Sequence, residues 1–105
     1  MKLITPQELE SWKKSGKEFQ LIDVRESYEI VNSTMGGYSI PMETVPARLD
    51  EIRTDIPVII HCQSGRRSEA VAHWIENKKE YQNIHSLQGG IVAWLEYTSA
   101  KKAQS

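Results

Sequence analysis

The single cysteine of the chain, Cys62, lies between an apolar run and a short polar loop. The run Val58–His61 is typical of a β-strand. The loop that follows contains a glycine and two arginines, and an alanine-rich helical pattern comes after it. At such a junction the N–H groups of the loop and the N-terminus of the helix can hold a thiol as thiolate. The residues therefore favour reactive cysteine chemistry over the alternative of a buried cysteine that only fills the core.

The residues after Cys62 have the composition of an anion-binding loop. If they curl around the sulfur, successive backbone N–H groups converge on it, and Gly65 permits the positive φ that such a curl requires. Arg66 and Arg67 add positive charge, unless one or both point to solvent. We expect a Cys62 pKa below its ordinary value of about 8.5. The candidate binding residues of the loop are Gln63, Ser64, Gly65, Arg66 and Arg67.

His61 precedes the cysteine, but strand geometry argues against its acting as the base of a cysteine–histidine pair. Neighbouring side chains of a strand point to opposite faces, so His61 should face away from the thiol. His73 and His85 are expected at the surface or in packing positions. A single cysteine excludes an internal disulfide, and three scattered histidines predict no zinc site. We therefore expect neither a metal nor another cofactor.

Asp23 and Arg25 lie at the end of a second strand-like run, residues 19–24. Two roles are open for them. They either orient the cysteine loop from behind it or form a structural ion pair at the end of the strand. The residue types alone favour neither role.

The composition is that of a single soluble domain. With 105 residues the chain is near the commonest domain size and can form one core. Its net charge of −1 offers no overall attraction to nucleic acid or to an anionic membrane. The N-terminus lacks the apolar stretch of a signal peptide, and no run is long enough to span a bilayer. We expect a cytoplasmic location, where a free thiol stays reduced, and no membrane or nucleic-acid partner.

Helical and strand-like patterns alternate along the chain. Thr5, Pro6 and Glu8 form a capping box with proline in the first turn, which predicts a helix that Gly16 ends. Further helices are expected over residues 26–31, 44–52, 67–79 and from 90 onward, and strands over residues 19–24, 38–40, 58–61 and 84–87. This alternation predicts an α/β fold, a small three-layer sandwich with a mainly parallel central sheet flanked by helices. We expect a domain over residues 1–98 and a flexible tail over residues 99–105, with Cys62 and Asp23 at the C-terminal ends of strands, where sites in such sheets gather.

Four segments occur in the order and spacing of a known family. They are residues 21–25 (Leu-Ile-Asp-Val-Arg), 40–41 (Ile-Pro), 62–68 (Cys-Gln-Ser-Gly-Arg-Arg-Ser) and 87–94 (Leu-Gln-Gly-Gly-Ile-Val-Ala-Trp). Together they resemble the single-domain rhodanese-like sulfurtransferases over about residues 3–95. The resemblance implies the same small α/β sandwich, with Cys62 as the sulfur-carrying nucleophile at the base of a loop that ends at Arg67.

The resemblance also implies a two-step sulfur transfer. The Cys62 thiolate attacks the outer sulfur of a donor such as thiosulfate, sulfite leaves, and a Cys62 persulfide remains. The persulfide, held by the loop N–H groups, then passes its sulfur to cyanide or to a thiol, which should give ping-pong kinetics. The implied partners are a small-molecule sulfane-sulfur donor and a thiophilic acceptor, with a protein among the possible acceptors.

One segment departs from the family pattern. Rhodanese-like chains usually carry Gly-His-Ile before a Gly-Ala pair, whereas this chain has Asn32, Ser33 and Thr34, followed by Gly36 and Gly37. No histidine role can be carried onto this segment. The departure bears on donor specificity more than on the chemistry.

Two other functions compete with sulfur transfer. Protein tyrosine phosphatases place five residues between cysteine and arginine, whereas four residues separate Cys62 from Arg67. The shorter loop favours a sulfur atom over a tetrahedral phosphate, which needs a wider loop and a bidentate arginine. Rhodanese-like folds also serve as interaction modules without activity, but inactive versions commonly lack the cysteine. The presence of Cys62 therefore favours an enzyme.

Overall fold

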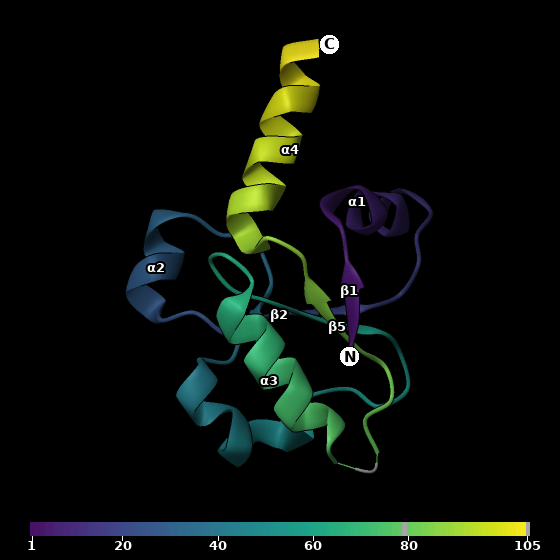
Figure 1. Cartoon of the computed structure of the whole chain (residues 1–105), viewed down its shortest axis with the longest axis vertical. Helices are drawn as coiled ribbons and strands as arrows, with labels where there is room; N and C mark the ends of the chain where they lie inside the picture. The colour runs from purple at the N-terminus through teal and green to yellow at the C-terminus, as the bar shows by residue number, and fades with distance from the viewer. Residues whose placement is uncertain (79, 105) are drawn as a thin grey trace.

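Among the residues that the structure describes, five parallel strands form one sheet in the order β1-β5-β4-β2-β3. Figure 1 shows the edge strand β1 beside β5. The computed structural model describes residues 1–78 and 80–104. The strands are β1 (Lys2–Ile4), β2 (Gln20–Asp23), β3 (Tyr38–Ser39), β4 (Val58–His61) and β5 (Ile84–Leu87). The parallel pairing brings the C-terminal ends of β2 and β4 to the same edge, so that Asp23 stands opposite His61.

Helices cover both faces of the sheet, as a three-layer sandwich requires. They are α1 (Pro6–Lys14), α2 (Ser27–Asn32), the 3-10 helix η1 (Met42–Glu51), α3 (Arg66–Glu76) and α4 (Gly90–Gln104). On one face η1 and α3 enclose a core that includes Ile60 and Val71. On the other face α1 and α4 enclose a second core around Leu9 and Ile59. The α/β sandwich predicted from the alternating patterns is therefore confirmed.

Strand β4 is buried along its whole length and supplies both cores. Ile60 and Cys62 belong to the core under α3, whereas Ile59 belongs to the core under α1. This alternation follows from the pleat of the strand, in which successive side chains point to opposite faces. A strand in the centre of the sheet is covered by helices on both faces, so all of its side chains are buried. The mostly apolar segment Val58–His61 suits that position.

The ends of several elements differ from the sequence prediction. The capping box of α1 is present, with the Thr5 side chain accepting from the Glu8 N–H. The short edge strand β1 was not predicted from its three residues. The expected α-helix over residues 44–52 is a 3-10 helix with Pro46 inside it. Helix α3 ends at Glu76, and Lys79, which was expected to lie at its end, is outside the described residues.

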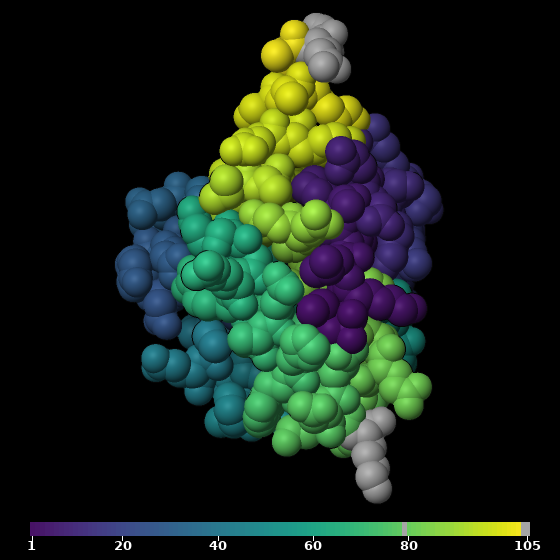
Figure 2. Space-filling view, viewed as in Figure 1, coloured from purple at the N-terminus to yellow at the C-terminus, as the bar shows by residue number. Residues whose placement is uncertain are grey.

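Helix α4 continues through the segment that was expected to be a flexible tail. It is helical to Gln104, and its C-terminal half extends beyond the rest of the molecule (Figure 2). Glu10 of α1 holds this half, because it accepts a hydrogen bond from the Tyr97 hydroxyl at 2.9 Å and pairs with the Lys101 ammonium group. The sequence prediction overlooked these partners because they lie far away in the chain. Within the described residues, no helix has the length and apolar character that crossing a membrane demands.

Candidate active site

Cys62 is the first residue after β4, and backbone N–H groups surround its sulfur. The N–H of Gly65 donates to Sγ at 3.1 Å and the N–H of Ser68 donates at 3.3 Å. The loop turns through Gly65, whose φ of 104° lies in the region that favours glycine. Gly65 also precedes the first residue of α3, so the helix N-terminus points at the sulfur. The curled loop predicted from the sequence is therefore present.

The side chain of Ser68 adds a hydroxyl group to the N–H groups around the Cys62 sulfur. Its Oγ lies 3.5 Å from the Cys62 Sγ and is completely buried. Burial raises the pKa of the Cys62 thiol, but the hydrogen bond with the Ser68 hydroxyl and those from the N–H groups of Ser68, Gly65 and Ser64 lower the pKa by more than burial raises it. The net effect is a Cys62 pKa below its ordinary value, in the direction expected from the sequence. Ser68 itself was not predicted as a site residue.

The start of α4 fixes the outer side of the loop. The N–H of Ile91 donates to the Cys62 carbonyl oxygen at 2.9 Å, and the N–H of Val92 donates to the Gln63 carbonyl oxygen at 3.2 Å. A Cβ at Gly90 would lie only 2.5 Å from that Gln63 oxygen, so glycine allows this close approach. These two carbonyl groups point toward α4, away from the sulfur. The N–H of Ser64, on the opposite side of the Gln63 peptide group, therefore points toward the sulfur.

Asp23 and Arg25 form a buried ion pair that also contacts the loop. The Arg25 guanidinium donates to both Asp23 carboxylate oxygens, at 2.9 to 3.2 Å. It also donates to the Gln63 side-chain oxygen at 3.4 Å and to the Ser33 carbonyl oxygen at 2.7 Å. The two roles left open by the sequence are therefore compatible. The segment that departs from the family pattern takes part through the backbone of Ser33.

The two arginines of the loop have different surroundings. Arg67 forms a two-pronged ion pair with Glu29 of α2, with both N–O distances at 2.7 Å. This hydrogen-bonded pair lowers the pKa of Glu29 to about 2 and raises the pKa of Arg67. Arg66 is exposed, and its guanidinium has no hydrogen bond or ion pair with any other described residue. Arg66 is therefore the loop cation that is available to an anion in solution.

His61 lies on the opposite side of the strand from the thiol, as strand geometry predicts. Its Nε2 is 3.7 Å from an Asp23 carboxylate oxygen, and a Cβ on Gly37 would lie 3.5 Å from the same nitrogen. Neither ring nitrogen has a hydrogen-bond partner among the residues that the structure describes. Burial is the main reason why the pKa of His61 is lowered, so the imidazole is held neutral.

Comparison with known proteins matches most of this chain to one family. Residues 5–97 match the rhodanese-like domain family. The chain belongs to this family. The four motifs that suggested the resemblance all lie within the matched residues, and that expectation is confirmed.

Several relatives of this rhodanese-like domain cover most of its length. The uncharacterized protein YqhL of Bacillus subtilis is 36% identical over 97% of this chain and 79% of its own length. A sulfurtransferase of Allochromatium vinosum is 37% identical over 70% of this chain and 69% of its own length. The crystal structure of a rhodanese-like domain protein from Staphylococcus aureus superposes with a TM-score of 0.77, at 31% identity, over 90% of this chain and 91% of that one.

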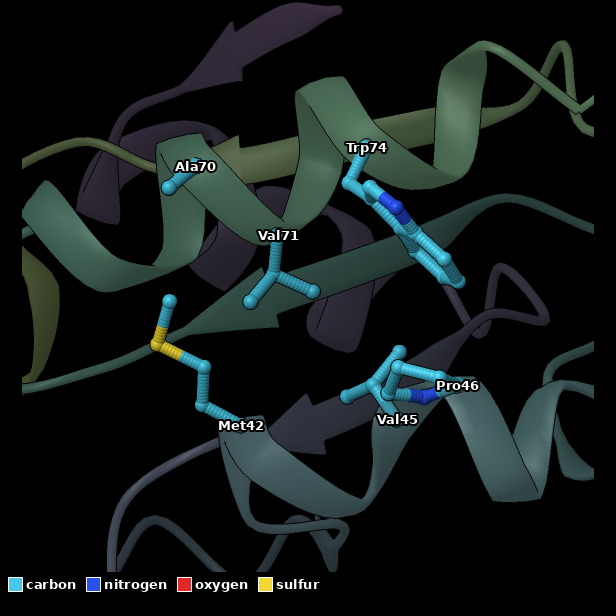
Figure 3. A pocket seen from close by; sticks show the side chains of 6 residues that line it. All are labelled: Met42, Val45, Pro46, Ala70, Val71 and Trp74. Carbon is cyan, nitrogen blue, oxygen red and sulfur yellow. The ribbon is translucent and has the colours of Figure 1, made fainter.

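The rhodanese-like domain also has an apolar hollow beside α3 (Figure 3). Its volume is about 260 Å³, and its lining comes from η1 and α3. The lining residues are Met42, Val45, Pro46, Ala70, Val71 and Trp74. None of these side chains is a nucleophile or an ionisable group, in contrast to the residues of the Cys62 loop. In the part of the chain that the structure describes, no cluster of three or more His, Cys, Asp or Glu side chains could hold a metal ion.

Sequence reasoning missed three residues of this site. Ser68 follows the loop by a single position, and its place in the first turn of α3 was the signal that could have identified it. Glu29 contacts Arg67 of the loop from 38 positions away, and Ser86 contacts Ser68 from 18 positions away. Only the folded chain brings these two residues to the loop.

Proposed function

We propose that the protein is a sulfurtransferase that carries a sulfane sulfur as a persulfide on Cys62. The observation that carries the proposal is the convergence of the Gly65 and Ser68 N–H groups and the Ser68 hydroxyl on the Cys62 sulfur. These donors stabilise the thiolate, which is the nucleophilic form of cysteine. The A. vinosum relative is named a sulfurtransferase, which supports the same class of reaction.

In the first half-reaction the Cys62 thiolate attacks the outer sulfur of the donor. With thiosulfate, the new Cys62 S–S bond forms while the sulfur–sulfur bond of thiosulfate breaks, and sulfite leaves with the electron pair. The exposed Arg66 attracts the anionic donor to the loop. The product is a Cys62 persulfide anion, which the positive end of α3 and the loop N–H groups stabilise as they stabilise the thiolate.

In the second half-reaction an acceptor attacks the outer sulfur of the persulfide. Cyanide becomes thiocyanate, and a thiolate acceptor becomes a persulfide. Cys62 leaves as the thiolate, for which the Ser68 hydroxyl and the loop N–H groups are already in place. The same hydrogen-bond donors therefore stabilise the thiolate both as the nucleophile of the first step and as the leaving group of the second. Because the thiol must stay reduced between turnovers, a cytoplasmic location is part of this proposal.

Two assays run on the same preparation test the reaction class. We expect wild type to form thiocyanate from thiosulfate and cyanide with ping-pong kinetics, and Cys62→Ser to form none. We expect neither protein to hydrolyse para-nitrophenyl phosphate. Hydrolysis that depends on Cys62 without thiocyanate formation would make the protein a phosphatase. Failure of both assays with several sulfane donors would favour an interaction module.

A further inference from the structure

We infer that Ser86 of β5 is a positioning residue that acts on the Cys62 sulfur through the hydroxyl of Ser68. The inference rests on the proposed function in one respect, namely that the thiolate is the reacting group. Ser86 does not touch the sulfur in the structure. Its Oγ lies 2.8 Å from the Oγ of Ser68, which in turn lies 3.5 Å from Sγ.

The Ser68 hydroxyl has more neighbours than protons. A hydroxyl group donates one hydrogen bond and accepts two. Three groups surround the Ser68 Oγ, namely the Cys62 sulfur, the Gly65 carbonyl oxygen at 3.1 Å and the Ser86 hydroxyl. If Ser68 donated its proton to Ser86, no proton would remain for the sulfur. The direction of the bond between the two serines therefore decides whether Ser68 can stabilise a thiolate.

The surroundings of Ser86 settle that direction. Ser86 is completely buried, and its Oγ has no hydrogen-bond partner other than Ser68 among the described residues. A buried hydroxyl that donates to nothing is costly. The Gly65 carbonyl and the Cys62 sulfur offer Ser68 other acceptors, whereas Ser86 has only Ser68. Ser86 is therefore the donor, and the Ser68 proton stays available.

This arrangement satisfies every group in both ionisation states of Cys62. When the thiol is neutral, its S–H and the Ser86 O–H both donate to Ser68 Oγ, and Ser68 donates to the Gly65 carbonyl. When the thiol ionises, the Ser68 hydroxyl turns its proton to the sulfur while Ser86 continues to donate to Ser68. Hydrogen bonds that polarise one another in series are stronger than the same bonds alone. Ser86 thereby strengthens the bond that Ser68 gives to the thiolate.

The fold holds both serines in the positions that the hydrogen-bond chain from Ser86 through Ser68 to the sulfur requires. Ser86 lies within the sheet, where β5 pairs with β4 at Ile60 and with β1 at Leu3. Ser68 lies in the first turn of α3, and its N–H already binds the sulfur. The charged groups of the loop are Arg66, which is exposed, and Arg67, which is paired with Glu29. None of the hydrogen bonds of these charged groups involves either serine hydroxyl.

The test is the pH dependence of Cys62 alkylation by iodoacetamide in four proteins. These are wild type, Ser68→Ala, Ser86→Ala and the double variant. We expect Ser68→Ala to raise the Cys62 pKa most and Ser86→Ala to raise it by about half a unit, which lowers the alkylation rate below the pKa about threefold. Because Ser86 acts through Ser68, the double variant should match Ser68→Ala alone. An unchanged pKa in Ser86→Ala, or additive shifts in the double variant, would overturn the inference.

Ile84→Val is the matched control, because Ile84 is a buried residue of the same strand. It should lower the stability of the fold slightly, because it removes one buried methyl group, and leave the Cys62 pKa at the wild-type value. A shift of the Cys62 pKa as large as that in Ser86→Ala would mean that loosening β5 is enough to change this pKa. That result would contradict a role of the Ser86 hydroxyl through Ser68. The alkylation readout is independent of sulfur transfer. If the expected pKa pattern occurred without persulfide formation, only the proposed function would fail.

Discussion

The backbone N–H of Ile91 donates a hydrogen bond to the carbonyl oxygen of Cys62, at 2.9 Å. The first turn of α4 therefore binds the outer side of the loop whose inner side binds the cysteine sulfur. A trans peptide group places its N–H and C=O on opposite sides, so anchoring the Gln63 carbonyl outward directs the N–H of Ser64 inward, toward the sulfur. Gly90, which directly precedes Ile91, permits this contact, because a Cβ at that position would lie against both carbonyl oxygens.

Replacing Gly90 by alanine should disrupt the loop. The new methyl group would lie 2.5 Å from the Gln63 carbonyl oxygen and 2.6 Å from the Cys62 carbonyl oxygen. We expect Gly90→Ala to lower kcat/KM for sulfur transfer at least tenfold, because the N–H groups would no longer converge. Gly36→Ala is the matched control, since Gly36 also has a positive φ but open space around it. Gly90→Ala should lose about 1–3 kcal/mol more unfolding free energy than this control; equal losses and retained activity would contradict the account.

Replacing Arg25 by lysine should weaken both the strand end and the loop. Lysine keeps the charge but lacks the planar fork that spans Asp23, Gln63 and Ser33 in the structure. We expect Arg25→Lys to cost about 2 kcal/mol or more in urea unfolding and to slow transfer several-fold. Arg53→Lys changes an exposed pair with Asp55 and should leave both measurements unchanged. A wild-type transfer rate in folded Arg25→Lys would remove Arg25 from the positioning of the loop.

Arg66 and Arg67 should separate donor binding from stability. Arg66 is exposed and unpaired within the described chain, so Arg66→Ala should raise the KM for thiosulfate several-fold without changing the melting temperature. Arg67→Ala breaks the ion pair with Glu29 and, unlike Arg66→Ala, should lower the melting temperature. The rise in KM for Arg66→Ala should shrink at high salt, because ions screen an exposed charge. An unchanged KM at low salt would exclude Arg66 from donor attraction.

The pair of Glu29 and Arg67 also predicts a pH dependence of stability. The pKa of Glu29 is lowered to about 2 in the folded protein, from an ordinary value of 4.5. The unfolded state therefore binds the proton first, so the contribution of the pair is complete above about pH 4.5 and is lost as the pH falls toward 2. Glu29→Gln should cost about 1 kcal/mol at pH 7 and almost nothing near pH 2. Urea unfolding across this range, with the exposed Glu43→Gln as a control for net charge, measures the difference. A deficit that stays constant down to pH 2 would show that the cost is not electrostatic.

Local features of the sequence predicted the parts of the fold and site that are built from neighbouring residues. The α1 capping box involves residues three positions apart. The curl of the Cys62 loop is similarly local, because Gly65 reaches the sulfur from three positions away. The opposite orientations of His61 and Cys62 follow from the pleat of one strand. Such features depend little on the rest of the molecule, so residue types and spacing identify them.

Contacts between distant segments escaped the same reasoning. Strand β1 forms only because β5 offers it an edge, and α4 continues past residue 98 along contacts with Glu10. Glu29 and Ser86 have no pattern of their own and gain their importance from the loop residues beside them. Arg25 had two possible roles in the sequence, and only its distances to Asp23 and Gln63 showed that both contacts are present.

The most direct test of the central claim is the intact mass of the protein after treatment with thiosulfate. We predict that wild type gains the mass of one sulfur atom, that cyanide removes it with release of thiocyanate, and that peptide mapping places it on Cys62. Cys62→Ser should gain nothing under the same conditions. No mass gain with thiosulfate or with any other sulfane donor, in protein whose Cys62 is reduced and reacts with iodoacetamide, would contradict the account.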